Sequence, residues 1–176
     1  EGVPGHHYQI SLVQEDESLP DLLRFGQVPA TAYTEGWGLY AESLGQELGM
    51  FSDPYQWFGH LDMEMLRAVR LVVDTGLHAL QWDRQRAIDY MLANTSMAPR
   101  DVAVEIDRYI SNPGQACDYK VGELKFQELR RRATERLGPD FDIRRFHDQV
   151  LDTGALPLDV LEAKIDRWLM SGEAAQ

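Results

Sequence analysis

Residues 34–42 read TEGWGLYAE, and residues 1–7 read EGVPGHH. Around the first of these segments, from Thr31 to about Leu48, apolar residues recur at intervals of three and four, which predicts an amphipathic helix with Glu35 in its first turn. In the second segment, Pro4-Gly5 interrupts helical structure because proline lacks a backbone N–H and glycine is conformationally permissive. The sequence therefore predicts a helix that faces a distorted opening segment.

Helix signals continue to the end of the chain. Asp53-Pro54 predicts an N-cap followed by a long helix, Asp83 and Pro99 each open another, and residues 14–29 are predicted to be a connector. There is no strand alternation, internal repeat or low-complexity linker, so the prediction is an all-α fold: a single domain, residues 1–176, of six or seven amphipathic helices. The residues predicted to face inward from the long helix are Trp57, Phe58, Leu61, Met65, Ala68 and Val72.

Composition restricts the function. With 29 acidic and 17 basic residues the net charge is −12, which repels phosphate backbones and anionic lipids and so disfavours a nucleic-acid or membrane-surface role. No run of about 18 apolar residues predicts a transmembrane segment. The single cysteine, Cys117, excludes an intrachain disulfide and a cysteine-based metal cluster. Because the first residue lies inside a motif, the chain is interpreted as a fragment of a longer protein.

The opening segment combines a glutamate with a histidine pair, and the predicted helix carries a second glutamate. Imidazole nitrogen and carboxylate oxygen suit Zn²⁺, and a further carboxylate can activate a water. The common HExxH motif is not intact, however. From a histidine before Glu1 to His7, a straight helix would climb about 10 Å, too far for both to bind one ion. A metal site therefore requires Pro4-Gly5 to fold the chain back, and composition alone leaves that question open.

Four segments in order carry a family resemblance. They are ExxPGHH, TEGWGLYAE, RAVRLVVDTGLH (residues 67–78) and PGQACDYKVGELK (residues 113–125). Together they resemble the C-terminal part of the bacterial domain-of-unknown-function family 885, which is related to the glutamate-type zincins, or gluzincins. The resemblance covers about the first two thirds of the chain. It implies that residues 1–176 are the C-terminal part of a gluzincin-like metallopeptidase domain, within a larger zincin-like helical protein that binds one zinc ion.

The family's opening motif is HExxPGH, and the resemblance implies a role for each matching residue. Glu1 matches the general base, His6 the second metal histidine and Glu35 the third metal ligand. His7 is expected to line the substrate site, although the resemblance leaves open which of the two histidines is the ligand. The first metal histidine would lie immediately upstream of Glu1. Gly38 stands where the family often has alanine, a departure that we expect to leave the proposed ligands untouched.

Three further side chains have a functional and a structural interpretation. Tyr119 or His78 could donate a hydrogen bond to a developing oxyanion, or be a core tyrosine and a helix-end histidine with structural hydrogen bonds. Arg70 could bind a substrate carboxylate through its fork of donors. The alternative for Arg70 is a local ion-pair ladder with Arg67 and Asp74 on one helix face. The sequence leaves these alternatives open.

The sequence and the resemblance together predict a zinc-dependent peptidase. Its expected partners are a peptide substrate and the missing N-terminal part of the same protein. The alternative is a non-catalytic helical domain of the same fold that binds a peptide or a partner helix. A histidine immediately before Glu1 favours the enzyme, and its replacement favours the binding domain. A metal-free hydrolase is disfavoured because no serine or cysteine lies in a nucleophile motif.

Overall fold

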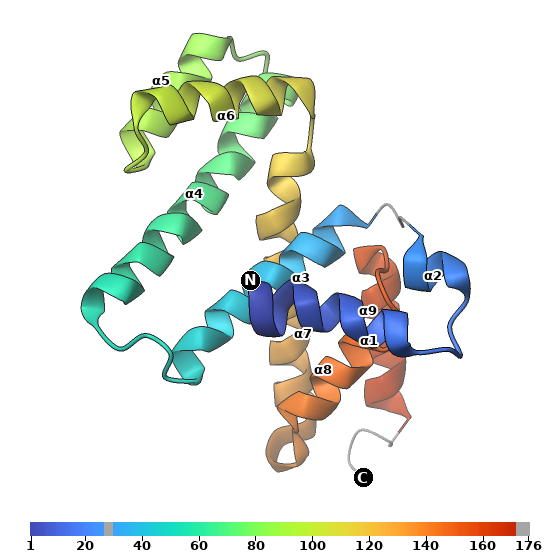
Figure 1. Ribbon diagram of the computed structural model, residues 1–176. Coiled ribbons are helices and arrows are strands. Elements are labelled where there is room, and N and C mark those ends of the chain that lie inside the picture. The colour runs from blue at the N-terminus through green and yellow to red at the C-terminus, as the bar shows by residue number, and fades with distance from the viewer. Residues whose placement is uncertain (27–29, 172–176) are drawn as a thin grey trace. The chain divides into compact units, whose positions relative to one another are not determined.

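A computed structural model describes residues 1–26 and 30–171, and these residues are all-α, with no strand among them (Figure 1). The all-α prediction is confirmed. Two short elements, the π-type turn η1 (Gly2–His6) and the 3-10 turn η2 (Gly138–Asp140), accompany the α-helices. Those helices are α1 (His7–Glu15), α2 (Asp21–Phe25), α3 (Thr31–Glu47), α4 (Pro54–Ala79), α5 (Arg84–Asn94), α6 (Pro99–Ser111), α7 (Gln115–Leu137), α8 (Ile143–Leu151) and α9 (Leu158–Met170).

Helix starts follow the local signals in the sequence. The Asp53 carboxylate accepts hydrogen bonds from the backbone N–H groups of Tyr55 and Gln56, at 2.8 and 3.0 Å, and so caps α4. Asp83 caps α5 in the same way, and Pro99 is the first residue of α6. The predicted connector differs from the structure because it contains the short helix α2. Its residues 27–29 lie outside the described residues.

By their contacts the helices form two compact units, which are described separately. Unit 1 comprises Glu1–Glu42 and Val121–Gln176. Its core is rich in aromatic side chains, in which Trp37 packs edge-to-face on Phe126 and on His147, with ring centroids 5.9 and 5.3 Å apart. The Tyr40 hydroxyl lies 2.8 Å from Nε2 of His147, so this histidine is part of the packed aromatic cluster. Unit 1 therefore holds α3 at its centre.

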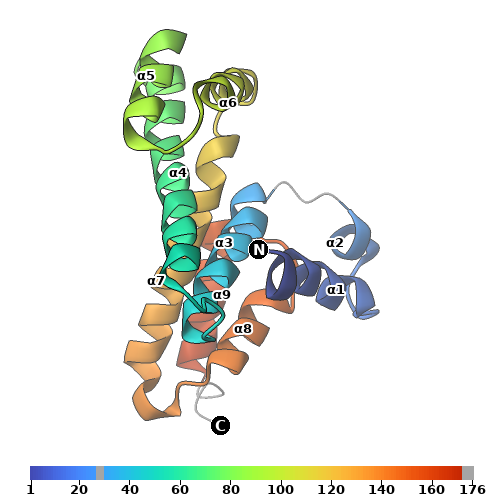
Figure 2. The ribbon, with the colours of Figure 1, turned by 60° about the vertical axis from the view of Figure 1, so that its left-hand side comes forward.

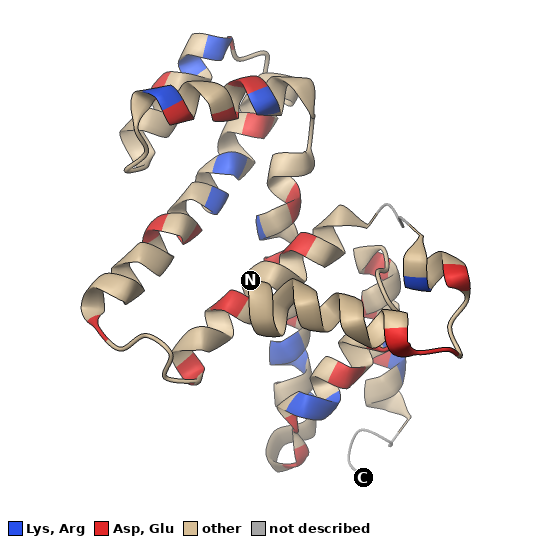
Figure 3. Ribbon diagram, viewed as in Figure 1, with Lys and Arg blue, Asp and Glu red and all other residues tan. Residues whose placement is uncertain are grey.

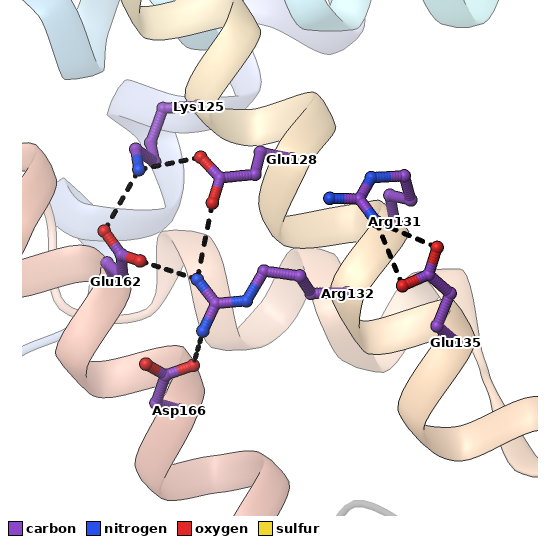
Figure 4. A network of polar contacts seen from close by, with 7 residues as sticks. All are labelled: Lys125, Glu128, Arg131, Arg132, Glu135, Glu162 and Asp166. Carbon is purple, nitrogen blue, oxygen red and sulfur yellow. Dashed lines mark hydrogen bonds and ion pairs between the residues drawn. The ribbon is translucent and has the colours of Figure 1, made fainter.

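Unit 1 also fixes α9 to α7 by charge. Figure 4 shows Arg132 of α7 between Glu162 and Asp166 of α9, with Lys125 binding Glu162 as well. Arg131 instead pairs with Glu135 on its own helix, at 2.8 Å. Arg131 thus belongs to a solvated face of α7, whereas Arg132 links α7 to α9. Acidic and basic residues otherwise lie along most helices (Figure 3).

Unit 2, Ser43–Lys120, is built on α4, with α5 and α6 beside its C-terminal half (Figures 1 and 2). Its core includes Leu66, Val69 and Val73 from α4 and Tyr109 from α6. This is not the face that the sequence predicted. The stripe of Phe58, Leu61, Met65 and Val72 is exposed, because α4 carries a second row of apolar residues that packs on α5 and α6. No helix in the described part of the chain is long and apolar enough to cross a bilayer.

Candidate metal centre

The opening segment turns back on itself before α1 begins. Val3, Pro4 and Gly5 have non-helical backbone angles, and the N–H of His6 donates to the carbonyl of Glu1 at 2.8 Å. Because of this short loop, the segment from Glu1 to His6 does not rise along an axis as a straight helix would. The expectation that Pro4-Gly5 folds the chain back is confirmed, and His6 consequently lies at the start of α1, close to the backbone of Glu1.

Helix α3 holds this turn in place. The Trp37 indole N–H donates to the carbonyl of Gly5 at 3.2 Å, and Gly5 is buried against α3. A β-carbon added to Gly38 would lie 2.7 Å from Nε2 of His6, closer than atoms pack. In this chain the His6 ring therefore occupies the space that a side chain at position 38 would take. The expectation that Gly38 leaves the proposed ligands untouched is wrong.

His6 and Glu35, distant in sequence, meet in this arrangement. Nε2 of His6 lies 3.4 Å from Oε2 of Glu35, and both side chains keep partial exposure, 31% and 23%. Two ligands that each lie about 2.0–2.1 Å from one tetrahedral ion are about 3.3 Å apart. The pair is also longer than a charge-assisted hydrogen bond of about 2.7–2.9 Å. An imidazole and a carboxylate at this separation fit the donor types and the spacing of a zinc site.

The remaining candidates in unit 1 are exposed. Glu1 and His7 flank the turn with exposed side chains, and the carbonyl of Glu1 accepts the hydrogen bond that closes the loop. Within residues 1–26 and 30–171 there is no cluster of three or more His, Cys, Asp or Glu side chains able to hold a metal. The described residues thus bring together two candidate ligands, His6 and Glu35, whereas a catalytic zinc site has three protein ligands.

Negative charge governs the electrostatics of this pair. Contact with Glu35 raises the pKa of His6 above its ordinary value of 6.5, partial burial opposes the rise, and the charge of Glu1 adds to it. The Glu1 carboxylate is therefore near enough to act on the same imidazole. The negative charge of Glu35 and Glu1, which favours protonated His6, would also favour a bound cation at this position.

We predict that Gly38→Ala separates His6 from Glu35. The new methyl group occupies the place of the imidazole edge, and the ring moves because a side chain yields more easily than the α3 backbone. The pKa of His6 then falls towards 6.5, as followed by its ring signals in an NMR titration of the metal-free chain. Gly59→Ala, where nothing lies within 4 Å, is the control. An unchanged His6 titration in Gly38→Ala would contradict the proposed contact.

Two glycines, Gly36 and Gly122, determine how closely α3 approaches α7. A β-carbon on Gly122 would lie 1.8 Å from the carbonyl oxygen of Ala32 and 2.7 Å from the α-carbon of Gly36, and one on Gly36 would lie 2.4 Å from the α-carbon of Gly122. The two helices therefore touch backbone to backbone. Gly36 immediately follows Glu35, so this contact also fixes where the Glu35 carboxylate leaves the helix.

A pocket of about 370 Å³ adjoins the pair in unit 1. Gln9, one turn after His6, and Thr34, directly before Glu35, line it together with apolar side chains such as Val13 and Leu23. Gln9 is only 5% exposed, and neither atom of its amide has a hydrogen-bond partner of good geometry among the described residues. Gln9 carries no motif that marks it in the sequence, although its position three residues after His6 on a helix places both on one side.

Arg70 lies in unit 2 and already binds a carboxylate. Its Nε donates to the Tyr109 hydroxyl at 2.8 Å, and Nη2 binds Glu105 at 3.1 Å. Arg70 is only 8% exposed. Asp74, its expected partner in a local ladder, accepts the N–H of Gly114 at 3.1 Å instead. The Glu105 carboxylate thus occupies the Arg70 guanidinium, which the functional interpretation assigned to a substrate carboxylate. This geometry favours a structural role for Arg70.

Tyr119 and His78 also belong to unit 2. The Arg70 guanidinium lies 5.0 Å from the centre of the Tyr119 ring, which is half-buried. His78 Nε2 lies 3.0 Å from the carbonyl of Tyr109, to which it donates a hydrogen bond, as expected of a structural helix-end histidine. The structure brings together His6 and Glu35, with Glu1 and His7 on the same turn. It gives Tyr119 and His78 contacts within their own unit.

The Glu105 cluster makes the stability of unit 2 sensitive to acid. Burial acts to raise the pKa of Glu105, but hydrogen bonds from Arg108 and Tyr109, with the charges of Arg108 and Arg70, lower it from 4.5 to about 2. A depressed pKa stabilises the fold fully above pH 4.5, and that contribution is lost as the pH falls towards 2. We expect Glu105→Gln to flatten the loss of thermal stability over this range. An identical pH profile in Glu17→Gln, an exposed control, and in Glu105→Gln would contradict this account.

The comparisons agree with the motifs. The model of the family described as "Bacterial protein of unknown function (DUF885)" matches residues 1–165. The chain belongs to this family. A DUF885 assignment leaves the activity open, and no curated protein matches the chain.

Two solved structures are similar to this DUF885 chain. The putative lipoprotein from Colwellia psychrerythraea shares 50% sequence identity over 97% of the chain, with a TM-score of 0.92. A putative lipoprotein of unknown function from Shewanella oneidensis has a TM-score of 0.82 over 93% of the chain and, at 23% identity, shows the fold alone. The chain spans only 29% of the length of either relative.

Proposed function

We propose that the chain contributes the metal-binding and general-base residues of a zinc-dependent peptidase, within a longer protein. The observation that carries the proposal is the 3.4 Å approach of His6 Nε2 and Glu35 Oε2 from two separate motifs. Their donor types and spacing are those of two ligands of one tetrahedral ion. The third ligand is the histidine that the family motif places before Glu1.

In this proposal each residue of the turn has one task. When bound, zinc supplies a Lewis acid that polarises the scissile carbonyl and lowers the pKa of a water. His6 and Glu35 hold it. Glu1, exposed and close to His6, takes a proton from the attacking water and passes it to the leaving amine. His7 lies exposed beside the ligands, where it can contact the substrate chain.

The adjoining pocket supports a peptide substrate. Its lining combines apolar side chains such as Val13 and Leu23 with the polar side chains of Gln9, Thr34 and Arg24, which suits the mixed apolar and polar groups of a peptide. Tyr119 and His78 remain candidates for the oxyanion donor. The Tyr119 hydroxyl accepts a hydrogen bond from Gln115 and keeps its own proton to donate, whereas His78 would have to exchange its hydrogen bond to the Tyr109 carbonyl for one to the substrate.

Removal of Glu35 tests the proposal. In the longer protein we expect Glu35→Ala to lower the zinc content, measured by atomic emission, well below one ion per chain. The loss of affinity should exceed the about 10- to 100-fold typical of losing an outer-shell partner, because a ligand is removed. Glu17→Ala, which removes the same charge from an exposed position, should keep its zinc. Full zinc retention in Glu35→Ala would remove this residue from the ligand set.

The alternative is a non-catalytic binding domain of the same fold. It predicts a longer protein that lacks the upstream histidine and purifies without stoichiometric zinc. The same emission measurement on the unsubstituted protein therefore separates the two functions before any substrate is known.

A further inference from the structure

Helix α4 has an apolar face that nothing in unit 2 covers. Tyr55, Phe58, Leu61 and Met65 are 87, 67, 46 and 51% exposed. Spacings of three and four residues place them along one side of the helix. The hydrophobic pattern that predicted an inward face is therefore present, but it points away from the unit 2 core, which begins at Leu66. We call these four residues the α4 stripe.

The α4 stripe is rigidly mounted. Asp53 caps the helix, and Phe51 packs on Trp57 and on His60, with ring centroids 5.4 Å apart in both pairs. His60 is buried, on the side of the helix opposite the solvent. Within unit 2, the loop residue Phe51 thus packs on the first turns of α4 and leaves the α4 stripe uncovered.

The first two turns of α4, which carry Tyr55, Phe58 and Leu61, hold no charged residue. No charged residue occurs from Pro54 to Leu61, and Figure 3 shows this part of α4 without basic residues. Leu48 and Met50, in the corner before α4, are each 63% exposed. Large contiguous apolar surfaces of this kind mark interaction sites in folded proteins. Their partner must itself be apolar, since nothing here recognises charge.

We propose that the α4 stripe is an internal interface, covered by the remainder of the longer polypeptide. The chain accounts for 29% of the Colwellia relative, so most of that related polypeptide lies outside the part matched here. A covalently linked partner needs no association from solution. Two copies of this chain, each with a net charge of −12, would repel one another. The occupant that fits is the apolar face of an amphipathic helix packed against α4.

Thiol labelling of the longer protein tests the α4 stripe independently of metal or activity. Phe58→Cys places a reactive group on the stripe, and Val104→Cys, at a residue 60% exposed on α6, is the matched control. The native Cys117 contributes little background, because burial, with Asp74 nearby, raises the pKa of its thiol to about 11. We expect Phe58→Cys to react about tenfold or more slowly than Val104→Cys, reflecting burial that only local opening relieves.

A charged substitution in the α4 stripe provides a second test. Phe58→Asp should lower the melting temperature of the longer protein, whereas Val104→Asp should leave it nearly unchanged. Equal labelling of Phe58→Cys and Val104→Cys would overturn the proposal. Protection that disappears on dilution would also overturn it, in favour of a second copy. Protection that requires added lipid vesicles would overturn it in favour of a membrane surface.

Discussion

Glu1→Gln in the longer protein is expected to keep its zinc and to lose about 10²- to 10⁴-fold in kcat, the usual contribution of a general base. Glutamine has almost the same shape but cannot accept the water proton. The backbone of residue 1 is held by the His6 N–H, at 2.8 Å, so the substitution should not disturb the turn. His6 and Glu35 remain to bind the ion.

Two measurements on one sample check this expectation. Atomic emission gives the zinc content, and mass spectrometry of a mixed peptide library gives turnover without assuming a particular substrate. Glu17→Gln is the control for loss of a carboxylate at an exposed site. Near-normal turnover in Glu1→Gln would exclude the general-base role. Loss of zinc would show instead that Glu1 belongs to the ligands.

Gly122→Ala is expected to lower the free energy of unfolding by about 3 kcal/mol or more, at the upper end for overpacked sites. Its β-carbon would lie 1.8 Å from the Ala32 carbonyl oxygen, and helix backbones cannot give way as side chains do. Gly36→Ala should behave alike, because its β-carbon meets the α-carbon of Gly122 at 2.4 Å. Both changes push α3 away from α7 and displace Glu35 with it.

Chemical denaturation measured by circular dichroism tests this, with Gly59→Ala as the control. Gly59 lies in a helix with nothing within 4 Å of an added β-carbon, so there alanine should stabilise by about 0.5–1 kcal/mol. Opposite signs at Gly59 and Gly122 separate packing from helix propensity. If Gly122→Ala also stabilised, the close approach of the two helices would be wrong.

Helix positions could be predicted from the sequence because their signals are local. Asp53, Asp83 and Pro99 act on backbone groups within a turn of themselves, and each begins a helix in the structure. The buried side of α4 could not be predicted, because the helix has apolar residues on two sides. The choice between the row with Leu61 and the row with Val73 depends on α5 and α6, which pattern alone cannot place.

The candidate metal centre likewise has features that the sequence predicted and features that it did not. The resemblance singled out His6 and Glu35, and the structure brings them to 3.4 Å. Why they meet was not visible in either motif, because it depends on Gly38, Gly36 and Gly122, where the relevant property is a missing side chain. Glycines inside helical segments were the available signal. Each lowers helix stability, so its presence there indicates a close contact that leaves no room for a side chain.

The backbone contact of Gly36 and Gly122 limits how such a chain can change. An oversized side chain in a core is commonly accommodated when a neighbour becomes smaller. Here the neighbour is already glycine, the smallest residue, so no second substitution can restore the space. Neither glycine can therefore be substituted, whatever residue stands at the other position. A larger side chain could be accommodated only if an entire helix shifted. Laboratory evolution of this chain would therefore keep glycine at both positions of this crossing, whatever else it changed.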